Sequence, residues 1–375
     1  MAGIYIHIPF CKSKCHYCNF YSLASSRHVR DFVPALIKEI GLMQNYLAGE
    51  KIETIYLGGG TPSLLDYDTL MMVFDKLRKT YVISADAEIT IEANPDDLDV
   101  KKINDLKRTP VTRISIGIQS FFDDDLKYLN RIHTASQTES SVKRSQDVGF
   151  ENISIDLIYG IPTLTDEKWV ENLDISFSLN VPHISAYGLT VEPKTAMETL
   201  IRKGKATAVD EKQSVRQYKI LMRQMKANGF IHYEISNFCK DGFISLHNSN
   251  YWKGVKYIGL GPSAHSYDQS SRQWNTSDIL KYLESIEQGN IPAEKEILSE
   301  TDKLNEYIMT SLRTIRGCDL DYIGKTFGSG LQNSIKKRID KHIAANHIAF
   351  TDHILTLTDE GKLFADGIAA GLFEE

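Results

Sequence analysis

The sequence has no hydrophobic run long enough to cross a membrane and no excess of positive charge. A transmembrane helix needs about 20 consecutive apolar residues, and no segment approaches that length. The formal net charge is -6, which argues against a nucleic-acid-binding surface. The chain also begins without the basic segment and cleavage site of a signal peptide. We therefore expect a cytoplasmic protein with no membrane span and no nucleic-acid partner.

Cysteine is scarce, with 5 residues in a chain of 375. Because this number is odd and nothing suggests export, a disulfide framework is not expected. Cys239 and Cys318 are isolated and should be small buried residues. Cys11, Cys15 and Cys18 instead stand close together with the spacing C-x3-C-x2-C. The sequence lacks the second ligand pair that would follow at zinc-finger distance.

The three clustered cysteines predict a 4Fe-4S cluster with one iron left open. Thiolates are the usual ligands of such clusters, so Cys11, Cys15 and Cys18 are the predicted metal ligands. Three thiolates on one loop leave the fourth iron free to bind a substrate. The alternative is a Cys3His zinc site that includes His16. His16 adjoins Cys15 in the sequence, so its side chain should leave in a different direction, and we favour the cluster.

Short β-branched runs alternate with helical periodicity in the first half of the chain. The predicted strands are 4–8, 54–57, 88–92, 112–119, 152–158 and 183–190. Six strand-helix units in sequence predict the α/β class with a parallel sheet. We expect this sheet to be closed or partly closed into a TIM-like barrel.

Polar or glycine-rich residues occur at the ends of all six predicted strands. In chain order they are the cysteine loop, Gly58-Gly59-Gly60-Thr61-Pro62, Glu92, Gln119, Asp156, and Thr190 with Glu192. Parallel sheets build their sites at the carboxyl ends of the strands, so one shared cavity is expected. Taken singly, each residue is equally well explained by a helix cap or a tight turn. Arg131, likewise, could simply pair with Asp123 or Asp124 on its own helix.

The alternation ends near residue 210, and we predict three regions. They are a core barrel at 1–235, a connecting region at 236–295, and a smaller helical, winged-helix-like C-terminal domain at 296–375. In the last region, helical periodicity precedes a predicted hairpin of 348–350 and 354–357. The basic residues of 336–341 alternate with isoleucines at helical spacing, which is typical of a solvated helix face.

Six ordered motifs resemble those of radical S-adenosyl-L-methionine (SAM) proteins related to the oxygen-independent coproporphyrinogen III oxidase. They are YIHIPFC at 5–11, CHYC at 15–18, GGGTPS at 58–63, IEANP at 91–95, SIGIQSF at 115–121 and IDLIYG at 155–160. The resemblance runs from Tyr5 to about Leu260 and continues more weakly beyond. It implies a partial (β/α)6 TIM-like barrel that holds a 4Fe-4S cluster and SAM.

The resemblance also implies roles for the strand-end residues. SAM would bind the open iron, and an electron from the cluster, supplied by a partner protein, would cleave SAM to a 5'-deoxyadenosyl radical. The implied SAM contacts are Tyr5, Tyr17, Gly59, Gly60, Thr61, Glu92, Gln119, Arg131 and Asp156.

Two features separate the chain from the oxidase itself. The oxidase is expected to carry a further cysteine two residues after the third cluster ligand, and this chain has Phe20 there. The oxidase is also expected to have a longer N-terminal extension, whereas Tyr5 already lies in the first predicted strand. Both differences argue against oxidase activity.

The connecting region contains His247, Asn248, Tyr251 and Trp252 in the pattern H-N-x-x-Y-W. This pattern resembles the haem-binding signature of the haem chaperone (HemW) branch, in which His247 would be an axial iron ligand and the aromatic rings would pack on the porphyrin. His265 is a second candidate ligand. Without the resemblance, a turn with a packed aromatic plug is the better interpretation.

The sequence therefore predicts a haem chaperone that binds a 4Fe-4S cluster, SAM and haem. Its predicted partners are haem-accepting proteins, such as membrane respiratory enzymes, and an electron donor for the cluster. The enzymatic alternative is oxidative decarboxylation of coproporphyrinogen III by the radical SAM mechanism. A structural zinc or cluster protein without SAM chemistry is the third hypothesis, which the strand-end residues disfavour.

Overall fold

The computed structural model describes residues 1–374, and its centre is a parallel sheet. All six predicted strands are confirmed, and they pair in parallel in chain order. They are β1 (Ala2–Ile8), β2 (Ile52–Gly59), β3 (Ile83–Ala93), β4 (Arg113–Gln119), β5 (Asn152–Tyr159) and β6 (His183–Gly188). Both faces of β1 are largely buried: Ile4, Ile6 and Ile8 lie on one face and His7 on the other, as expected where helices or loops cover both sides of parallel strands.

Helices connect these strands. They are α1 (Val29–Leu42), α2 (Tyr67–Thr80), α3 (Val100–Lys107), α4 (Asp123–Tyr128), α5 (Ala135–Asp147) and α6 (Asp166–Ser178). Several begin at a side chain that accepts a hydrogen bond from a first-turn amide, for example Asp66 before α2 and Thr165 before α6. Such N-caps satisfy amides that lack a partner within the helix. The local sequence therefore sets where these crossover helices begin, although α1 and α4 have no such side-chain cap.

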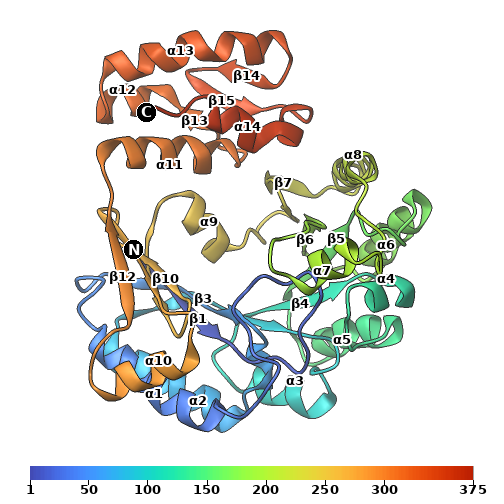
Figure 1. Cartoon of the computed structure of the whole chain (residues 1–375), viewed down its shortest axis with the longest axis vertical. Helices are drawn as coiled ribbons and strands as arrows, with labels where there is room; N and C mark the ends of the chain where they lie inside the picture. Colours follow the sequence, from blue (N-terminus) through green and yellow to red (C-terminus); the bar gives the residue numbers. More distant parts are fainter. Residues whose placement is uncertain (375) are drawn as a thin grey trace.

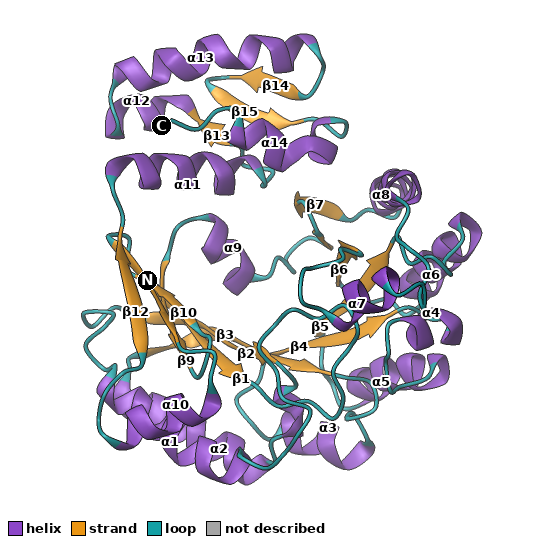
Figure 2. Ribbon diagram, in the orientation of Figure 1, coloured by secondary structure: helices purple, strands orange, loops and turns teal. Residues whose placement is uncertain are grey.

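The sheet is open and has 12 strands in the order β12-β11-β10-β9-β1-β2-β3-β4-β5-β6-β8-β7. No pairing among the described residues joins its two edges, so the prediction of a partial barrel is confirmed and a closed barrel is wrong. Figure 2 shows α1, α2, α3 and α10 (Ile279–Glu287) along the outer side of the curved sheet. The short helix α9 (Leu246–Trp252) lies on the opposite, inner side.

Six further strands extend the sheet at both ends, and of these only β7 overlaps a segment predicted as extended, residues 233–235. Strand β9 (Lys256–Leu260) pairs in parallel with β1, and β10 (His265–Tyr267), β11 (Ser271–Asn275) and β12 (Ala293–Ile297) follow as antiparallel neighbours. At the other end, β8 (Asn237–Cys239) and β7 (Ile231–Glu234) continue from β6. The boundary predicted at residue 235 thus lies within one continuous sheet, between β7 and β8.

Residues from about 300 onward build a separate core (Figure 1). The elements are α11 (Glu300–Leu312), β13 (Cys318–Asp319), α12 (Leu320–Thr326), α13 (Ser329–Ala344), β14 (Ile348–Thr351), β15 (Ile354–Leu357) and α14 (Ala365–Ala370). The predicted hairpin is confirmed, because β14 pairs antiparallel with β15. Asp352 and His353 form its turn with positive φ angles, as two-residue hairpins require. Among the described helices, none combines the length and apolarity needed to span a bilayer.

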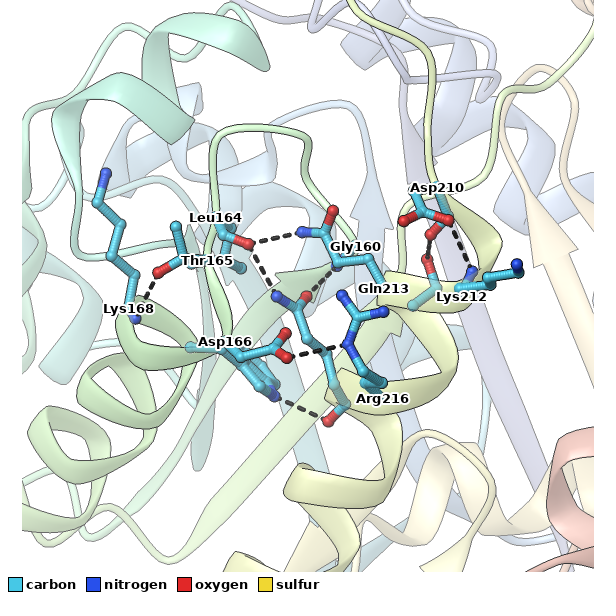
Figure 3. A network of polar contacts seen from close by, with 12 residues as sticks. Gly160, Leu164, Thr165, Asp166, Lys168, Asp210, Lys212, Gln213 and Arg216 are labelled. Carbon is cyan, nitrogen blue, oxygen red and sulfur yellow. Dashed lines mark hydrogen bonds and ion pairs between the residues drawn. The ribbon is translucent and has the colours of Figure 1, made fainter.

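The loop after β5 is held by α8 (Glu211–Ala227), as Figure 3 shows. The side-chain amide of Gln213 donates to the backbone carbonyls of Ile161 and Leu164. Arg216 forms an ion pair with Asp166 at 3.0 Å. The short helix α7 (Ala196–Arg202) precedes α8. These bonds fix the chain where it leaves the carboxyl end of β5.

A buried carboxylate ties the outer helices to the β9–β11 end of the sheet. Glu39 on α1 is fully buried and accepts hydrogen bonds from the Gly261 amide (2.7 Å), the Asn275 side chain (2.6 Å) and the Tyr282 hydroxyl (2.6 Å). Burial raises the pKa of Glu39 to about 7, and the three donors oppose this rise. Glu39 therefore positions the loop that follows β9.

The stability contributed by Glu39 should depend on pH. Because its folded pKa, about 7, exceeds the ordinary 4.5, the contribution is complete below about pH 4.5 and is lost as the pH rises through 7. We expect the free energy of unfolding of the wild type, relative to Glu39→Gln, to fall by about 2.5 kcal/mol between pH 5 and pH 8. Urea unfolding of both proteins at the two pH values measures this, and a constant difference would contradict the assignment.

Candidate functional site

A cavity of about 420 Å³ lies at the carboxyl ends of the parallel strands. Its walls include most of the residues that the sequence singled out. These are Cys11, Cys15, Tyr17, Cys18, Gly59, Gly60, Thr61, Glu92, Gln119, Arg131, Asp156, Thr190, Glu192 and Asn248. The structure therefore brings together residues that are more than 200 positions apart in the sequence.

The cysteine loop leaves β1 and is held in place by backbone hydrogen bonds. The amide of Cys11 donates to Leu23 at 3.0 Å, and the amide of His16 donates to Leu129 at 3.1 Å. The His16 ring lies against the Tyr128 carbonyl at 3.3 Å and is not part of the cavity wall. The loop thus presents its thiols, and not the imidazole, to the cavity.

The chemistry of this loop fits a cluster. Cys11, Cys15 and Cys18 are all partly exposed to the same cavity, and none forms a disulfide. The described residues contain no set of three or more His, Cys, Asp or Glu side chains placed to hold one metal ion. A cubane binds each thiolate through a different iron, so it suits three separated thiols better than a single zinc ion does.

Arg131 lies beside the cysteine loop. Its guanidinium donates to the Cys15 sulfur at 3.3 Å, the Asn94 side chain at 2.6 Å and the Gly117 carbonyl at 2.7 Å. No ion pair joins it to Asp123 or Asp124 in the described part of the chain. Arg131 therefore provides a fixed positive charge at the cavity wall, next to a predicted metal ligand.

The glycine-rich turn after β2 packs tightly against β1. Gly59 has a φ of +103°, and a Cβ atom there would lie 2.4 Å from the His7 ring. The amides of Gly60 and Thr61 donate to the carbonyls of Ile8 and Phe10, both at 2.8 Å. A side chain at either glycine would collide with β1, so glycine is required for this close approach.

Two carboxyl groups face the cavity from β3 and β5, the two strands that flank β4. Glu92 accepts hydrogen bonds from the Tyr56 hydroxyl at 2.8 Å and the Gly59 amide at 3.1 Å. Burial, together with the nearby charge of Asp156, raises the pKa of Glu92 to about 7. Burial also raises the pKa of Asp156, which accepts a hydrogen bond from Ser115. The site therefore holds two carboxyl groups with elevated proton affinity.

Gln119 ends β4 in a left-handed conformation. Its φ is +66°, it is nearly buried, and the β4–β5 register shifts just before it. A non-glycine residue rarely adopts this conformation, and such strain is often found where a side chain is aimed at a ligand. The irregularity turns Gln119 toward the cavity at the strand end.

Four of the predicted contacts lie outside this cavity: Tyr5, His247, Tyr251 and Trp252. Tyr5 sits in the middle of β1, away from the strand ends, and its hydroxyl contacts His7 at 3.0 Å. The structure therefore does not bring Tyr5 to the predicted SAM site. The ring of Trp252 lies 5.3 Å from the Arg313 guanidinium of the C-terminal unit and is not part of this cavity wall.

His247 and Tyr251 contact one another on the inner side of the sheet. The His247 ring is 2% exposed, and its nitrogens contact the Thr54 hydroxyl and the Tyr251 hydroxyl, each at 2.9 Å. The backbone amide of His247 donates to Glu88 at 2.9 Å. Of the H-N-x-x-Y-W residues, Asn248 alone lines the cavity of the cysteine loop.

Sequence reasoning missed several residues of the cavity wall. They include Tyr56, Asn94, Ser115, Asn130 and Tyr187. Asn94 and Ser115 lie within motifs that the sequence did single out, beside the predicted contacts. Tyr56 and Tyr187 lie within predicted strands, where an aromatic side chain is usually a core residue. Knowledge of which face of each strand points inward would have identified them.

Comparison with known families matches two models to this chain. Residues 5–175 match the radical SAM superfamily, and residues 298–364 match the HemN C-terminal domain. Membership of the radical SAM superfamily implies a 4Fe-4S cluster and SAM. The cavity described above offers three thiols and two carboxyl groups, a donor set that is compatible with these cofactors.

The chain is similar over its whole length to curated relatives. It is 33% identical to the heme chaperone HemW of Bacillus subtilis, with 100% of both chains covered. It is 32% identical to the heme chaperone HemW of Escherichia coli, with 98% of this chain and 96% of the relative covered. The solved structure of the E. coli coproporphyrinogen III oxidase HemN, a radical SAM enzyme, shares the fold with a TM-score of 0.85 at 21% identity, covering 99% of this chain and 90% of that one. The chain therefore belongs to the HemW family of radical SAM proteins.

Proposed function

We propose that this protein is a haem chaperone that holds a 4Fe-4S cluster and SAM and transfers haem to haem-requiring proteins in the cytoplasm or at the membrane. The observation that carries the proposal is the full-length similarity to relatives named heme chaperones. Phe20 adds support, because it stands where the oxidase is expected to have a cysteine and its side chain is 64% exposed at the cavity wall.

In this proposal Cys11, Cys15 and Cys18 hold the cluster. Their loop is anchored to Leu23 and Leu129 through backbone bonds, so the thiols are presented without large rearrangement. Arg131 beside Cys15 would offset part of the negative charge of the thiolates. When bound, the cluster and SAM together supply one-electron cleavage of the SAM sulfonium.

The two cavity carboxylates favour a cationic ligand. Burial raises the pKa of both Glu92 and Asp156, and it outweighs the nearby Arg113 guanidinium, which acts in the opposite direction on each. SAM carries an ammonium and a sulfonium group, and a cation beside these carboxylates would lower the pKa of both. Gln119, Tyr17, Gly59, Gly60 and Thr61 complete the proposed SAM contacts. Tyr5 would instead support the cavity wall, because its ring stacks on that of Tyr56.

The H-N-x-x-Y-W residues are the proposed haem-contacting motif. His247, Asn248, Tyr251 and Trp252 come from α9, which lies on the inner side of the sheet (Figure 1). Proposed recipients are haem-accepting proteins such as membrane respiratory enzymes, and the cluster would need an electron donor. The following three experiments test the cluster, the SAM site and the haem function separately.

Replacement of any of the three loop cysteines should abolish the cluster. We expect Cys11→Ala, Cys15→Ala and Cys18→Ala each to lose the iron and acid-labile sulfide of the anaerobically reconstituted protein, because each thiolate binds its own iron. Cys239→Ala and Cys318→Ala are matched controls, since both thiols are buried away from the cavity. Retention of a full cluster in a loop variant would contradict the assignment.

Removal of one cavity charge should weaken SAM binding. We expect Asp156→Asn to raise the Kd of SAM about 10- to 100-fold, because a hydrogen bond to a charged group contributes about 1.5–3 kcal/mol. Equilibrium dialysis of the reconstituted protein measures this. Asp124→Asn, which changes an exposed carboxylate outside the cavity, should leave the Kd unchanged. Equal affinities for the two variants would exclude Asp156 from the SAM site.

Haem binding and oxidase activity can be separated in one preparation. The anaerobically reconstituted protein should bind haemin stoichiometrically in an absorbance titration. The same protein, given coproporphyrinogen III, SAM and a reductant, should form no protoporphyrinogen above background. Robust protoporphyrinogen formation would replace the chaperone proposal with the oxidase alternative, and absence of haemin binding would remove the chaperone function.

A further inference from the structure

A second cavity of about 360 Å³ lies over β1 and the neighbouring strand β9. Its volume falls within the range of about 300–1,000 Å³ that is usual for small-molecule sites. Its lining is mostly aromatic. The lining residues are Tyr5, His7, Asn19, Phe20, Tyr21, Tyr251, Tyr257, Ser263 and His265. Flat apolar rings of this kind suit a planar, largely apolar ligand.

The sheet extension places these rings on one face. Tyr257 on β9 is the cross-strand partner of Tyr267 on β10, and His265 is the partner of Trp274 on β11. Directly opposed residues project from the same face of a sheet. The rings of His265 and Trp274 stack with their centroids 6.0 Å apart. The β9–β11 segment therefore forms an aromatic floor that continues toward Tyr5 on β1.

Helix α9 covers this floor. The Tyr251 ring meets the Tyr257 ring edge to face, with centroids 4.7 Å apart. Tyr251 is in turn held by the hydrogen bond between its hydroxyl and the His247 ring. The H-N-x-x-Y-W motif thus reaches the second cavity through Tyr251, although His247 itself is buried behind it.

Three histidines stand at or near this cavity, and they differ in the state of their ring nitrogens. His7 contacts the Tyr5 hydroxyl at 3.0 Å and the Tyr21 carbonyl at 2.8 Å. His247 likewise uses both nitrogens, toward Thr54 and Tyr251. Within residues 1–374 no hydrogen bond engages the His265 ring, and this residue is exposed at the cavity wall. His265 alone can give a nitrogen to a ligand without breaking an existing bond.

We propose that haem binds in this second cavity with His265 as an axial iron ligand, and that His247 is a positioning residue that acts through Tyr251. This inference rests on the proposed haem-chaperone function and gives it a location distinct from the SAM cavity. Imidazole is a common axial ligand of haem iron, and the surrounding tyrosine rings offer the apolar contacts that a porphyrin face needs.

The protonation state of His265 agrees with this role. Partial removal from water in the cavity wall and the nearby Arg272 guanidinium both lower the pKa of His265, which favours the neutral imidazole that binds metals. The loop that carries His265 is also fixed. The Gly261 amide is bonded to the buried Glu39, and a Cβ atom at Gly261 would lie 2.4 Å from the His7 carbonyl oxygen.

Phe20 links this site to the cluster loop. Asn19 and Phe20 line both cavities, directly after the third cysteine ligand. The exposed Phe20 ring is an apolar surface that a bound porphyrin would cover. A phenylalanine at this position therefore has a positive role in the proposed site, beyond the absence of a cysteine.

Haemin titration of the reconstituted full-length protein tests the assignment. We expect His265→Ala to raise the Kd of haemin at least about tenfold and to remove the histidine-ligated spectrum seen by electron paramagnetic resonance and resonance Raman spectroscopy. Added imidazole should restore that spectrum. His247→Ala should raise the Kd of haemin but keep the histidine-ligated spectrum, because this substitution removes only the hydrogen bond that holds Tyr251. Phe20→Ser should weaken binding without change of ligation.

His353→Ala is the matched control, since it removes an exposed histidine from the C-terminal unit. It should leave both the Kd and the spectrum unchanged. If wild type and His265→Ala bind haemin with the same Kd and spectrum, the location proposed here is wrong while the chaperone function stands. Loss of the histidine-ligated spectrum in His247→Ala, but not in His265→Ala, would assign the iron to His247. If the wild type binds no haemin, the chaperone function itself fails.

Discussion

The pairing of β1 on both sides is the constraint on which the rest of the structure depends. β1 hydrogen-bonds in parallel to β2 along one edge and to β9 along the other. Its carboxyl end delivers the cysteine loop, and its neighbours carry the glycine-rich turn and the His265 loop. The isoleucines of β1 are buried, so a shift of register would expose them and is strongly disfavoured. One strand therefore positions the walls of both cavities.

The parallel core was predictable from sequence, whereas the sheet extension was not. Short runs rich in β-branched residues mark the buried parallel strands, as with Ile4, Ile6 and Ile8, which share one buried face of β1. Strands β9 to β12 carry polar and aromatic residues and lie toward an edge, where one face meets other elements or solvent. β12, with the sequence AEKEI, is largely exposed. Its pairing with β11 depends on tertiary contacts that no local pattern reveals.

The candidate site divides in the same way. The strand-end residues meet because parallel topology places all carboxyl ends at one edge, and that rule needs no knowledge of side-chain packing. The orientation of His247 depends on the Thr54 hydroxyl of a distant strand, and Trp252 is covered by Arg313 from another unit. Such contacts arise only in the folded chain. The H-N-x-x-Y-W motif therefore indicated that these residues lie near a site, but it did not indicate which of their side chains face a ligand.

The wall formed by Asn19 and Phe20 has a thermodynamic consequence. Because the segment lines both cavities, any ligand that orders it on one side changes the surface offered on the other. Thermodynamic linkage is reciprocal. If a ligand in the first cavity changes the affinity of the second cavity for its ligand by some factor, the second ligand changes the affinity of the first cavity by the same factor. If a ligand in one cavity moves Asn19 and Phe20, these two residues couple the two cavities.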